Sequence, residues 1–290
     1  MSTSEVWEFE ALGTRWWIRA TGLSPDLRAS ITGIITEFDA TWSRFRPDAA
    51  IRQLAEAASS EVRTLSLPEE AGKLGRLYGE LHELSGGSVT PFIGASLARL
   101  GYDEHYSFRA QGAAVPAPRW GVDAHWEDRE IRATGPVIVD IGAAGKGLAV
   151  DLVSEFLGAS GAGPFLVDAS GDLRSGAGSE DRIALENPFD TSQAIGVVSV
   201  ADAALAASAV NRRSWGEGLH HVLDGLSGLP VRKVMATWVL APTAMLADGL
   251  ATALFFVPGE ELSRRYAVEW LSVHSDGHAE GSRYFLEGLF

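Results

Sequence analysis

The sequence predicts an α+β fold, with mixed or antiparallel sheets layered with helices, because strand and helix patterns occur without a regular βαβ rhythm. Apolar residues recur at a helical period in two long segments of the N-terminal third. Short runs rich in β-branched and aromatic residues, bounded by turn residues, predict strands elsewhere. No linker-like stretch interrupts the 290 residues, so a single domain, 1–290, is expected.

The predicted elements follow these local patterns in chain order. Residues 6–20 alternate apolar and polar side chains around Gly13, which predicts an early strand or hairpin. Residues 24–45 and 68–85 each predict a helix. After these, the sequence predicts a strand at 137–141, a helix at 148–157, a strand at 164–167, a strand pair at 182–185 and 194–200, a strand at 234–240, and a helix at 243–256 capped by Thr243.

The composition restricts the classes of function. A formal net charge of −14 disfavours nucleic acid and anionic membranes, so neither is expected as a partner. The absence of cysteine excludes disulfides, iron–sulfur clusters and thiol catalysis. The longest apolar stretch, 234–257, contains Pro242 and Asp248, which favours a buried strand and helix over a membrane span. Residues 1–16 lack a basic start and an apolar signal core, so a cytoplasmic protein is expected.

A glycine-rich segment at 137–157 is the first candidate for chemistry. A predicted strand delivers Asp140, a glycine loop follows, and a helix begins near Gly147. Free N–H groups at a helix start attract phosphate, and Lys146 adds a positive charge there. The pattern is not a Walker A loop, since Gly147 stands where Ser or Thr should follow Lys146. An ordinary tight strand-to-helix connection also explains the segment, and both interpretations stay open.

The predicted helix at 243–256 carries a second candidate. Asp248 and Thr252 are four residues apart and share one otherwise apolar face. A buried carboxylate is costly unless it is paired or ligated, and a carboxylate beside a hydroxyl suits a hard cation such as magnesium. A buried aspartate that caps a nearby backbone is the alternative.

Two further segments are less specific. His220 and His221 would point to opposite sides of a strand, so only one can face a site, and their spacing does not suit a zinc pair on a helix. A surface or otherwise satisfied imidazole remains the alternative for either. Asp168 and Asp172 flank a glycine turn, and turn chemistry alone accounts for them.

Taken in order, these segments resemble the FAD:protein FMN transferase family, the ApbE-type flavin transferases, over nearly the whole chain. The most specific matches are the Asp-x-Gly-x-x-x-Lys-Gly block beginning at Asp140, the His-x-x-Asp-x-x-Ser-Gly block beginning at His221, and the Ala-Asp-x-x-Ala-Thr block ending at Thr252. The remaining matches are ALGTRWWI (11–18), WSRFRPDAAIRQL (42–54), SGGSVTPFIGASLARLGYD (85–103) and FLVDASGD (165–172).

The resemblance implies an ApbE-like fold and a magnesium-dependent enzyme that cleaves FAD. Such an enzyme attaches FMN through a phosphoester to Ser or Thr of an acceptor protein, in a motif like Asp-x-x-Ser/Thr-Gly-Ala-Ser/Thr, and releases AMP. By position it implies Asp248 and His221 as catalytic residues. The implied metal ligands are the carbonyl of Ala143 with Asp248 and Thr252. The implied FAD contacts are Leu12, Phe45, Ser88, Val89, Thr90, Asp140, Lys146 and Val222.

Three positions depart from the family pattern. Thr90 stands where an acidic residue would meet the adenosine end, Gly225 replaces the usual proline, and 207–209 is Ala-Ser-Ala in place of Thr-Ser-Gly. Residues 224–230 only partly match the acceptor motif, so self-flavinylation is not expected. Two other functions therefore stay open: a magnesium-dependent FAD pyrophosphatase, which releases FMN and AMP, and a non-catalytic FAD-binding module, which leaves FAD intact.

Overall fold

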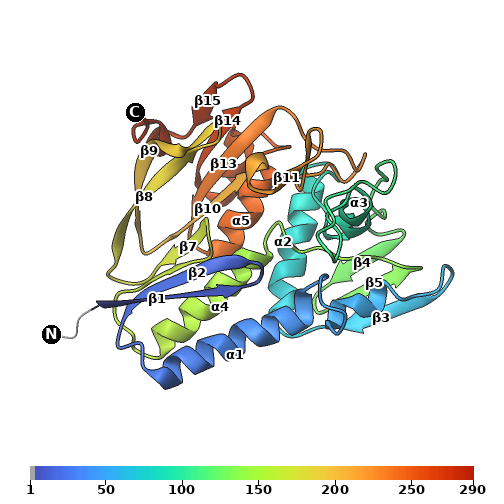
Figure 1. Cartoon of the computed structure of the whole chain (residues 1–290), viewed down its shortest axis with the longest axis horizontal. Helices are drawn as coiled ribbons and strands as arrows, with labels where there is room; N and C mark the ends of the chain where they lie inside the picture. Colours follow the sequence, from blue (N-terminus) through green and yellow to red (C-terminus); the bar gives the residue numbers. More distant parts are fainter. Residues whose placement is uncertain (1–3) are drawn as a thin grey trace. The chain divides into compact units, whose positions relative to one another are not determined.

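The computed structural model describes residues 4–290 (Figure 1), which form two compact units. Unit 1 comprises residues 4–37, 144–209 and 233–290, and unit 2 comprises residues 38–143 and 210–232. The chain passes between the units four times, so neither unit is one continuous stretch.

Unit 1 is built on an eight-stranded sheet whose neighbouring strands are all antiparallel. In spatial order the strands are β1 (Ser4–Ala11), β2 (Thr14–Thr21), β6 (Leu166–Asp168), β7 (Asp172–Ser175), β10 (Ala204–Ala209), β13 (Val234–Ala241), β14 (Glu269–His274) and β15 (Ala279–Gly281). Leu12 and Gly13 turn the first hairpin with φ values of 51° and 70°. Positive φ at both central residues is the backbone of a type I′ turn, which suits two-residue hairpins.

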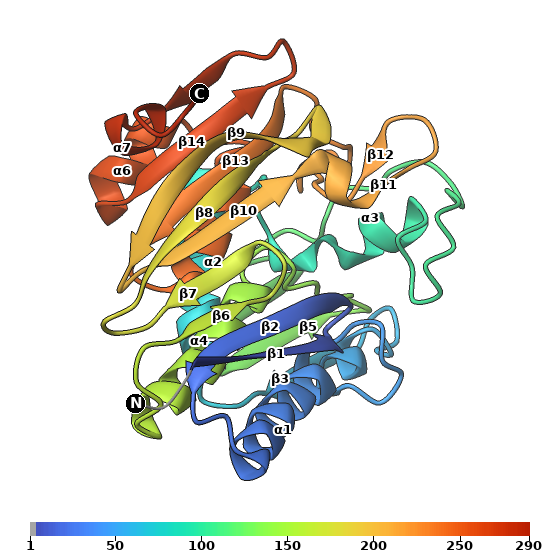
Figure 2. The ribbon, with the colours of Figure 1, turned by 60° about the vertical axis from the view of Figure 1, so that its left-hand side comes forward.

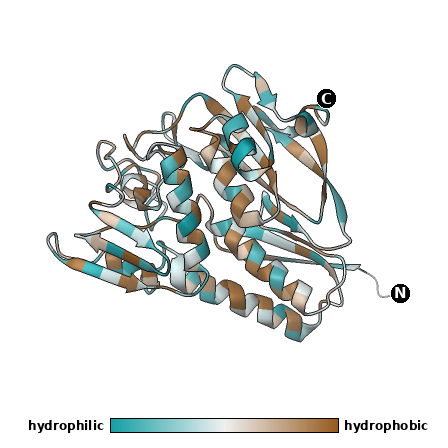
Figure 3. Cartoon of the chain, turned by 180° about the vertical axis from the view of Figure 1, so that it is seen from behind, coloured by the Kyte–Doolittle hydropathy of each residue, from teal (hydrophilic) through white to brown (hydrophobic). Residues whose placement is uncertain are grey.

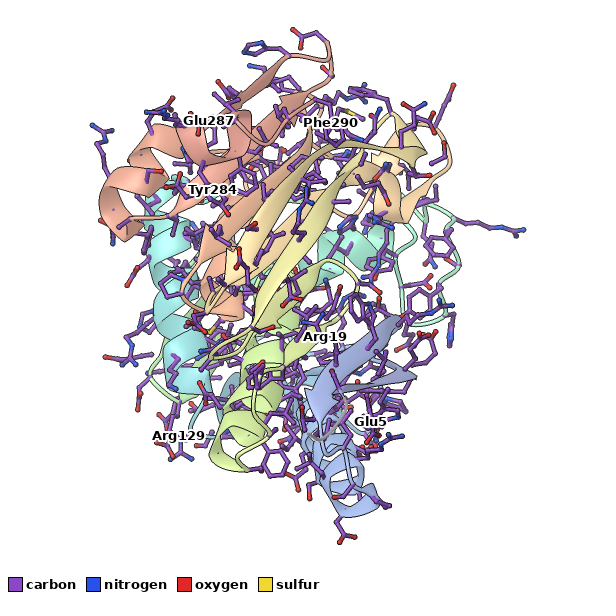
Figure 4. All side chains as sticks on the ribbon, turned by 90° about the vertical axis from the view of Figure 1, so that its left-hand side faces the viewer. Glu5, Arg19, Arg129, Tyr284, Glu287 and Phe290 are labelled. Carbon is purple, nitrogen blue, oxygen red and sulfur yellow. The ribbon has the colours of Figure 1, made fainter. Side chains whose placement is uncertain are left out.

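A second hairpin in unit 1 covers one face of this sheet (Figure 2). Its strands are β8 (Glu180–Asn187) and β9 (Asp190–Ala201). Leu185 and Val198 share a buried apolar core with Trp238 of β13. At one end, Arg19 of β2, labelled in Figure 4, forms an ion pair with Asp181 of β8.

Helices α4 (Gly145–Ala159) and α5 (Ala244–Ala253) lie against the opposite face. Along β13, Trp238 points to the hairpin, whereas the Thr237 hydroxyl donates to the carbonyl of Ala251 in α5 at 2.7 Å. Successive strand residues point to opposite faces, which explains this division. The other helices of the unit are α6 (Gly259–Tyr266), α7 (Arg283–Leu286) and the first part of α1 (Pro25–Trp42).

Unit 2 combines short helices with small sheets. Its elements are β3 (Val62–Ser66), β4 (Ala124–Glu127), β5 (Glu130–Thr134), β11 (Ser214–Trp215), β12 (Leu219–His220), α2 (Ala71–Leu84), α3 (Gly94–Arg99), and the 3₁₀ helices η1 (Ala50–Leu54), η2 (Pro91–Ile93) and η3 (Val210–Arg213). Helix α2 packs on β4, where the Tyr78 ring stacks on Trp126 with centroids 5.9 Å apart. A side chain at Gly75 would collide with the Trp126 indole, so α2 needs glycine at this crossing.

The α+β prediction is confirmed, as are the early hairpin, the helices within 24–45, 68–85, 148–157 and 243–256, and the strands near 164–167, 182–200 and 234–240. The strand predicted at 137–141 is wrong. This largely buried segment joins no sheet, because its backbone bonds to two 3₁₀ helices of unit 2: Val137 N–H donates to the Leu54 carbonyl of η1 and Asp140 N–H to the Pro91 carbonyl of η2. An apolar run shows burial, but it does not show which backbone will pair with it.

Helix surfaces are mixed in polarity. Figure 3 shows polar and apolar residues alternating along the helices. In α1 the buried residues Ile31, Ile35, Phe38 and Trp42 follow a helical repeat. Within residues 4–290, no helix has the length and apolar character needed to cross a bilayer.

Candidate functional site

Asp248 lies at a close contact between α4 and α5 in unit 1. Its side chain is 3% exposed, and its Oδ2 accepts a hydrogen bond from the Gly147 N–H at 2.9 Å. A Cβ atom on Gly147 would overlap the Ala244 carbonyl and lie 2.8 Å from the Asp248 Cβ. Thr252 follows one turn later on the same helix. Glycine at position 147 therefore lets a backbone N–H of the first turn of α4 reach the Asp248 carboxylate.

Charges around Asp248 are buried and close enough to interact. Burial raises the pKa of Asp248 well above its ordinary value, the charge of Asp172 raises it further, and Lys146 lowers it. The Lys146 ammonium donates to Asp172 Oδ2, and the other carboxylate oxygen of the fully buried Asp172 has no hydrogen-bond partner in the described structure. The predicted phosphate-binding lysine is thus held in place by Asp172.

The start of α5 is fixed by a side chain from α4. Both oxygens of Asp151 accept backbone hydrogen bonds, from the N–H groups of Ala244 and Met245, each at 2.9 Å. Arg174 pairs with the same carboxylate at 2.7 Å. Thr243 also caps α5, as predicted, by accepting from the Leu246 N–H. This second cap positions the helix that carries Asp248.

The sequence motifs do not reveal the carboxylates that support this site. Asp172, which turn chemistry alone accounts for in the sequence, begins β7 and holds Lys146. The sequence signal for Asp151 is its place in the apolar run 148–153 of α4, where a lone carboxylate needs a partner.

Asp168, at the end of β6, gives unit 1 a pH-dependent stability. Burial raises its pKa to about 6 from the ordinary 3.8, and the charge of Asp172 adds to the effect. Between pH 3.8 and about pH 6, the Asp168 carboxyl group is ionised in the unfolded chain but still protonated in the folded one. The free energy of unfolding therefore falls as pH rises through this range, by about 3 kcal/mol in total, and it stays lower above pH 6.

Asp168→Asn should remove the decrease in the free energy of unfolding between acidic and neutral pH. The amide oxygen can still accept from the Gly171 N–H, which now donates to Asp168 Oδ1 at 3.1 Å. We expect the variant to be more stable than the wild type by about 2–3 kcal/mol at pH 8 and nearly equal to it at pH 4. Urea unfolding at both pH values measures the difference. A gap between the proteins that does not change with pH would refute this explanation.

In unit 2, both carboxylate oxygens of Asp140 accept hydrogen bonds from other residues of the unit. One carboxylate oxygen accepts from the Gly142 N–H at 2.7 Å, which shapes the glycine loop, and the other accepts from Nε of Arg44. Arg44 is 5% exposed, and its guanidinium carbon lies 4.1 Å from the centroid of the Phe45 ring. Arg44 directly precedes the predicted flavin contact Phe45, but no motif in the sequence indicates its role.

Ala143, the last residue of unit 2 before the chain enters unit 1, is anchored by α2. Its N–H donates to the Tyr78 hydroxyl at 3.3 Å, and Tyr78 is fully buried against Trp126. The peptide between Gly142 and Ala143 therefore has a fixed orientation within unit 2, directly before the Ala143 carbonyl that is a predicted metal ligand.

Two departures from the family pattern contact each other in unit 2. The Gly225 N–H donates to the Ser88 carbonyl at 2.8 Å, a bond that proline could not make. A Cβ on Gly225 would lie 2.7 Å from Thr90. The Thr90 hydroxyl accepts from the Phe92 N–H and caps η2, and Val89 is buried. The altered loop and Gly225 therefore form one packed substructure.

The two histidines have different environments, as expected of neighbours. The His220 ring is buried between the Val231 carbonyl, 2.8 Å from Nε2, and the Val222 N–H, which donates to Nδ1. Burial lowers the pKa of His220. His220 is thus structural, which leaves the half-buried His221 as the functional candidate.

The predicted site residues are distributed over both units. Unit 1 holds Leu12 in the β1–β2 turn, Lys146, Asp248 and Thr252, and it brings Lys146 and Asp248 into one charged cluster. Unit 2 holds Phe45, Ser88, Val89, Thr90, Asp140, Ala143, His221 and Val222. Within the described residues, no three His, Cys, Asp or Glu side chains are arranged to hold a metal ion, so a cation would depend on mixed oxygen donors.

The sequence model of the ApbE family matches residues 12–272, which includes parts of both units. The chain belongs to the ApbE family. The solved structure of the ApbE protein from Thermotoga maritima has the same fold, with a TM-score of 0.83, 21% identity, and coverage of 99% of this chain and 100% of that one. The flavin transferase ApbE from Vibrio cholerae gives a TM-score of 0.81, also at 21% identity, over 99% and 100% of the two chains.

Curated ApbE relatives support the same assignment. A FAD:protein FMN transferase from Klebsiella pneumoniae is 25% identical over 94% of this chain and 84% of its own length. Another, from Vibrio cholerae, is 28% identical over 82% and 75%. The predicted membership of the ApbE family, its fold, and the transferase class of enzyme are confirmed.

Proposed function

We propose that the chain is a magnesium-dependent FAD:protein FMN transferase, which attaches FMN through a phosphoester to Ser or Thr of an acceptor protein and releases AMP. The observation that carries the proposal is the buried Asp248, bonded to the first turn of α4 and next to the Lys146–Asp172 pair. A buried carboxylate beside a lysine and a helix N-terminus suits a cation and a diphosphate together. The proposed reaction is the one that the names of the curated relatives state, FAD:protein FMN transfer.

The chemistry of the proposed ligands suits magnesium. Asp248 would provide a carboxylate with one oxygen bonded to a single N–H, Thr252 would provide a hydroxyl from the same helix, and Ala143 would provide a carbonyl. Hard cations prefer such oxygen ligands. A bound magnesium ion would neutralise charge on the diphosphate of FAD.

The chain's own residues then perform positioning and charge neutralisation, which phosphoryl transfer needs more than covalent catalysis. Lys146, held by Asp172, would contact the diphosphate. Asp140 would contact FAD, and Leu12, Phe45, Val222 and Ser88–Thr90 would line its site. In the transfer, the acceptor hydroxyl oxygen bonds to the flavin-side phosphorus, the bond to AMP breaks, and the hydroxyl proton is released. His221 and Asp248 are the candidates to receive that proton.

The acceptor protein would carry the motif Asp-x-x-Ser/Thr-Gly-Ala-Ser/Thr that the family resemblance implies. The enzyme would act in the cytoplasm, and both units would form a single functional domain. The match of one family model to parts of both units supports the last point.

The test is to incubate the purified protein with FAD, magnesium and an acceptor fragment that carries the motif. We expect the fragment to gain the mass of one FMN group, and AMP to appear in equal amount. A matched fragment with alanine in place of the acceptor Ser or Thr should gain nothing. Free FMN and AMP without acceptor would identify a pyrophosphatase instead, and stoichiometric binding of intact FAD would identify a binding module.

A further inference from the structure

Unit 2 exposes an uncharged surface on two neighbouring segments, 112–118 and 225–231. Neither segment contains a charged residue, although 21% of the chain is charged. Leu226 and Leu229 are 60% and 56% exposed, and Ala113 and Pro116 are exposed as well. These four side chains form the apolar patch. Exposed apolar side chains that are grouped without charges among them are typical of a protein-binding surface.

Backbone contacts hold the two segments side by side. The Ala117 N–H donates to the Gly225 carbonyl at 2.9 Å. A Cβ atom on Gly228 would overlap the Val115 carbonyl, and the φ of Gly228 is 71°, so glycine is needed where the segments cross. The Val115 carbonyl also accepts from the Ser96 hydroxyl at 2.6 Å, which ties the first segment to α3. The apolar patch is therefore one continuous surface on a fixed framework.

Asp224 fixes the conformation of the loop that carries the two leucines. Its carboxylate accepts from the Leu226 N–H at 3.0 Å and from the Ser227 hydroxyl at 2.9 Å. Its own N–H donates to the Leu229 carbonyl, and its carbonyl accepts from the Gly228 N–H at 2.7 Å. Side chains on a loop that is already ordered cost little backbone entropy when a partner covers them, which favours binding.

The same loop contacts residues that are predicted to bind FAD. The Gly225 N–H donates to the Ser88 carbonyl at 2.8 Å, and a Cβ on Gly225 would lie 2.7 Å from the Thr90 methyl group. Leu226 lies over Gly87, where a Cβ would be 3.0 Å from Leu226 Cδ2. A protein that covers the apolar patch therefore lies next to the predicted FAD-binding loop of the same unit.

Positive charge borders the apolar patch, in a chain whose formal net charge is −14. Arg99 Nε donates to the Ala113 carbonyl at 2.8 Å, and Arg232 directly follows the second segment. Both arginines are exposed, and within residues 4–290 neither forms an ion pair. Such a border suits an acidic partner, because complementary charges orient the encounter and exclude wrong partners.

We propose that the apolar patch and its two arginines are the docking surface for the acceptor protein, and that they recognise apolar and acidic residues on either side of the modified motif. This proposal rests on the proposed function, because an acceptor is needed only if FMN is transferred to a protein. It assigns acceptor selection to side chains that are not among the predicted FAD and metal contacts: Arg99, Ala113, Pro116, Leu226, Leu229 and Arg232.

The reaction explains why an acceptor would cover this surface. The acceptor hydroxyl must reach the phosphorus of bound FAD, so part of the acceptor protein has to rest on surface next to the FAD site during transfer. A second copy of the chain fits less well. A symmetric pair of patches would bring Arg99 and Arg232 towards the same two arginines of the other copy, and like charges oppose each other.

Two synthetic peptides test the docking surface. Both contain the motif Asp-x-x-Ser-Gly-Ala-Thr, flanked by leucine and glutamate residues in the first peptide and by serine and lysine residues in the second. We expect the wild type to transfer FMN to the first peptide with a KM about tenfold lower, a factor that corresponds to about 1.4 kcal/mol. The double variant Leu226→Ser/Leu229→Ser should lose most of this preference and keep the wild-type KM for FAD.

Fluorescence anisotropy of the same peptides, with alanine at the acceptor position, measures binding without turnover. Arg232→Gln should weaken binding of the first peptide and reduce its dependence on salt, because one charge that attracts the glutamates is lost. It should leave binding of the second peptide unchanged or strengthen it.

Val62→Ser is the matched control, because Val62 is 51% exposed in unit 2 but lies on β3, outside both segments. It should behave as the wild type does. Equal KM values for the two peptides in the wild type would overturn the docking surface, as would an unchanged preference in the double variant or an equal loss in Val62→Ser. Wild-type protein that binds no FAD and modifies neither peptide would overturn the proposed function, and the docking surface with it.

Discussion

Asp248→Asn should lower the kcat/KM of flavin transfer by about a thousandfold, because it removes the negative charge that would hold the cation while it changes little of the packing. The amide oxygen can still accept the hydrogen bond that the Gly147 N–H now donates to Asp248 Oδ2. The metal-free variant should be at least as stable as the wild type, since a carboxylate that is 3% exposed and close to Asp172 carries a desolvation cost.

Thermal unfolding with and without magnesium provides the second measurement. Magnesium at a hundred times its dissociation constant should stabilise the wild type by about 2.7 kcal/mol and leave Asp248→Asn unchanged. Asp168→Asn is the matched control, because it neutralises another buried aspartate of unit 1 and should keep the magnesium response. If Asp248→Asn keeps full activity or the full magnesium response, Asp248 is not a metal ligand.

Gly147→Ala should destabilise the protein by about 1–3 kcal/mol, although alanine favours helix over glycine. The added methyl group would overlap the Ala244 carbonyl and crowd Asp248, so α4 and α5 would have to separate. Transfer activity should fall as well, because the contact that orients Asp248 lies at this crossing.

Gly158→Ala in the same helix is the control. A Cβ there would meet nothing within 4 Å, so the substitution should stabilise the protein by about 0.5–1 kcal/mol. Chemical denaturation of both variants gives the two free energies. Opposite signs are expected, and a stabilised Gly147→Ala would show that the helices are not in close contact.

Local patterns were sufficient to predict most of the fold. The helical repeat of α1, the hairpin around Gly13 and the cap at Thr243 depend on nearby residues, and all three are observed. The order of strands in the sheet depends on distant segments: β2 lies beside β6, and the segment 137–141 finds partners at Leu54 and Pro91 rather than in a sheet. Neither pairing has a local signal.

The same distinction applies to the candidate site. Asp248, Thr252 and Lys146 stand in short motifs that a resemblance can locate. Asp172, Asp151 and Arg44 act on those motifs from other elements, and the residues they bind there lie 26 to 96 residues away in sequence. A carboxylate in a glycine turn gives no indication of the lysine it will meet.

The four crossings between the units have a consequence for synthesis on the ribosome. The N-terminal hairpin β1–β2 emerges first, but its neighbour β6 follows only after most of unit 2 has been made. The other side of the sheet forms later still, because β13 lies between β10 and β14 and begins at Val234. The free edges of β2 and β10 therefore stay unpaired while the residues between them and their later neighbours are synthesised, and unpaired strand edges of this kind are sites of misassembly.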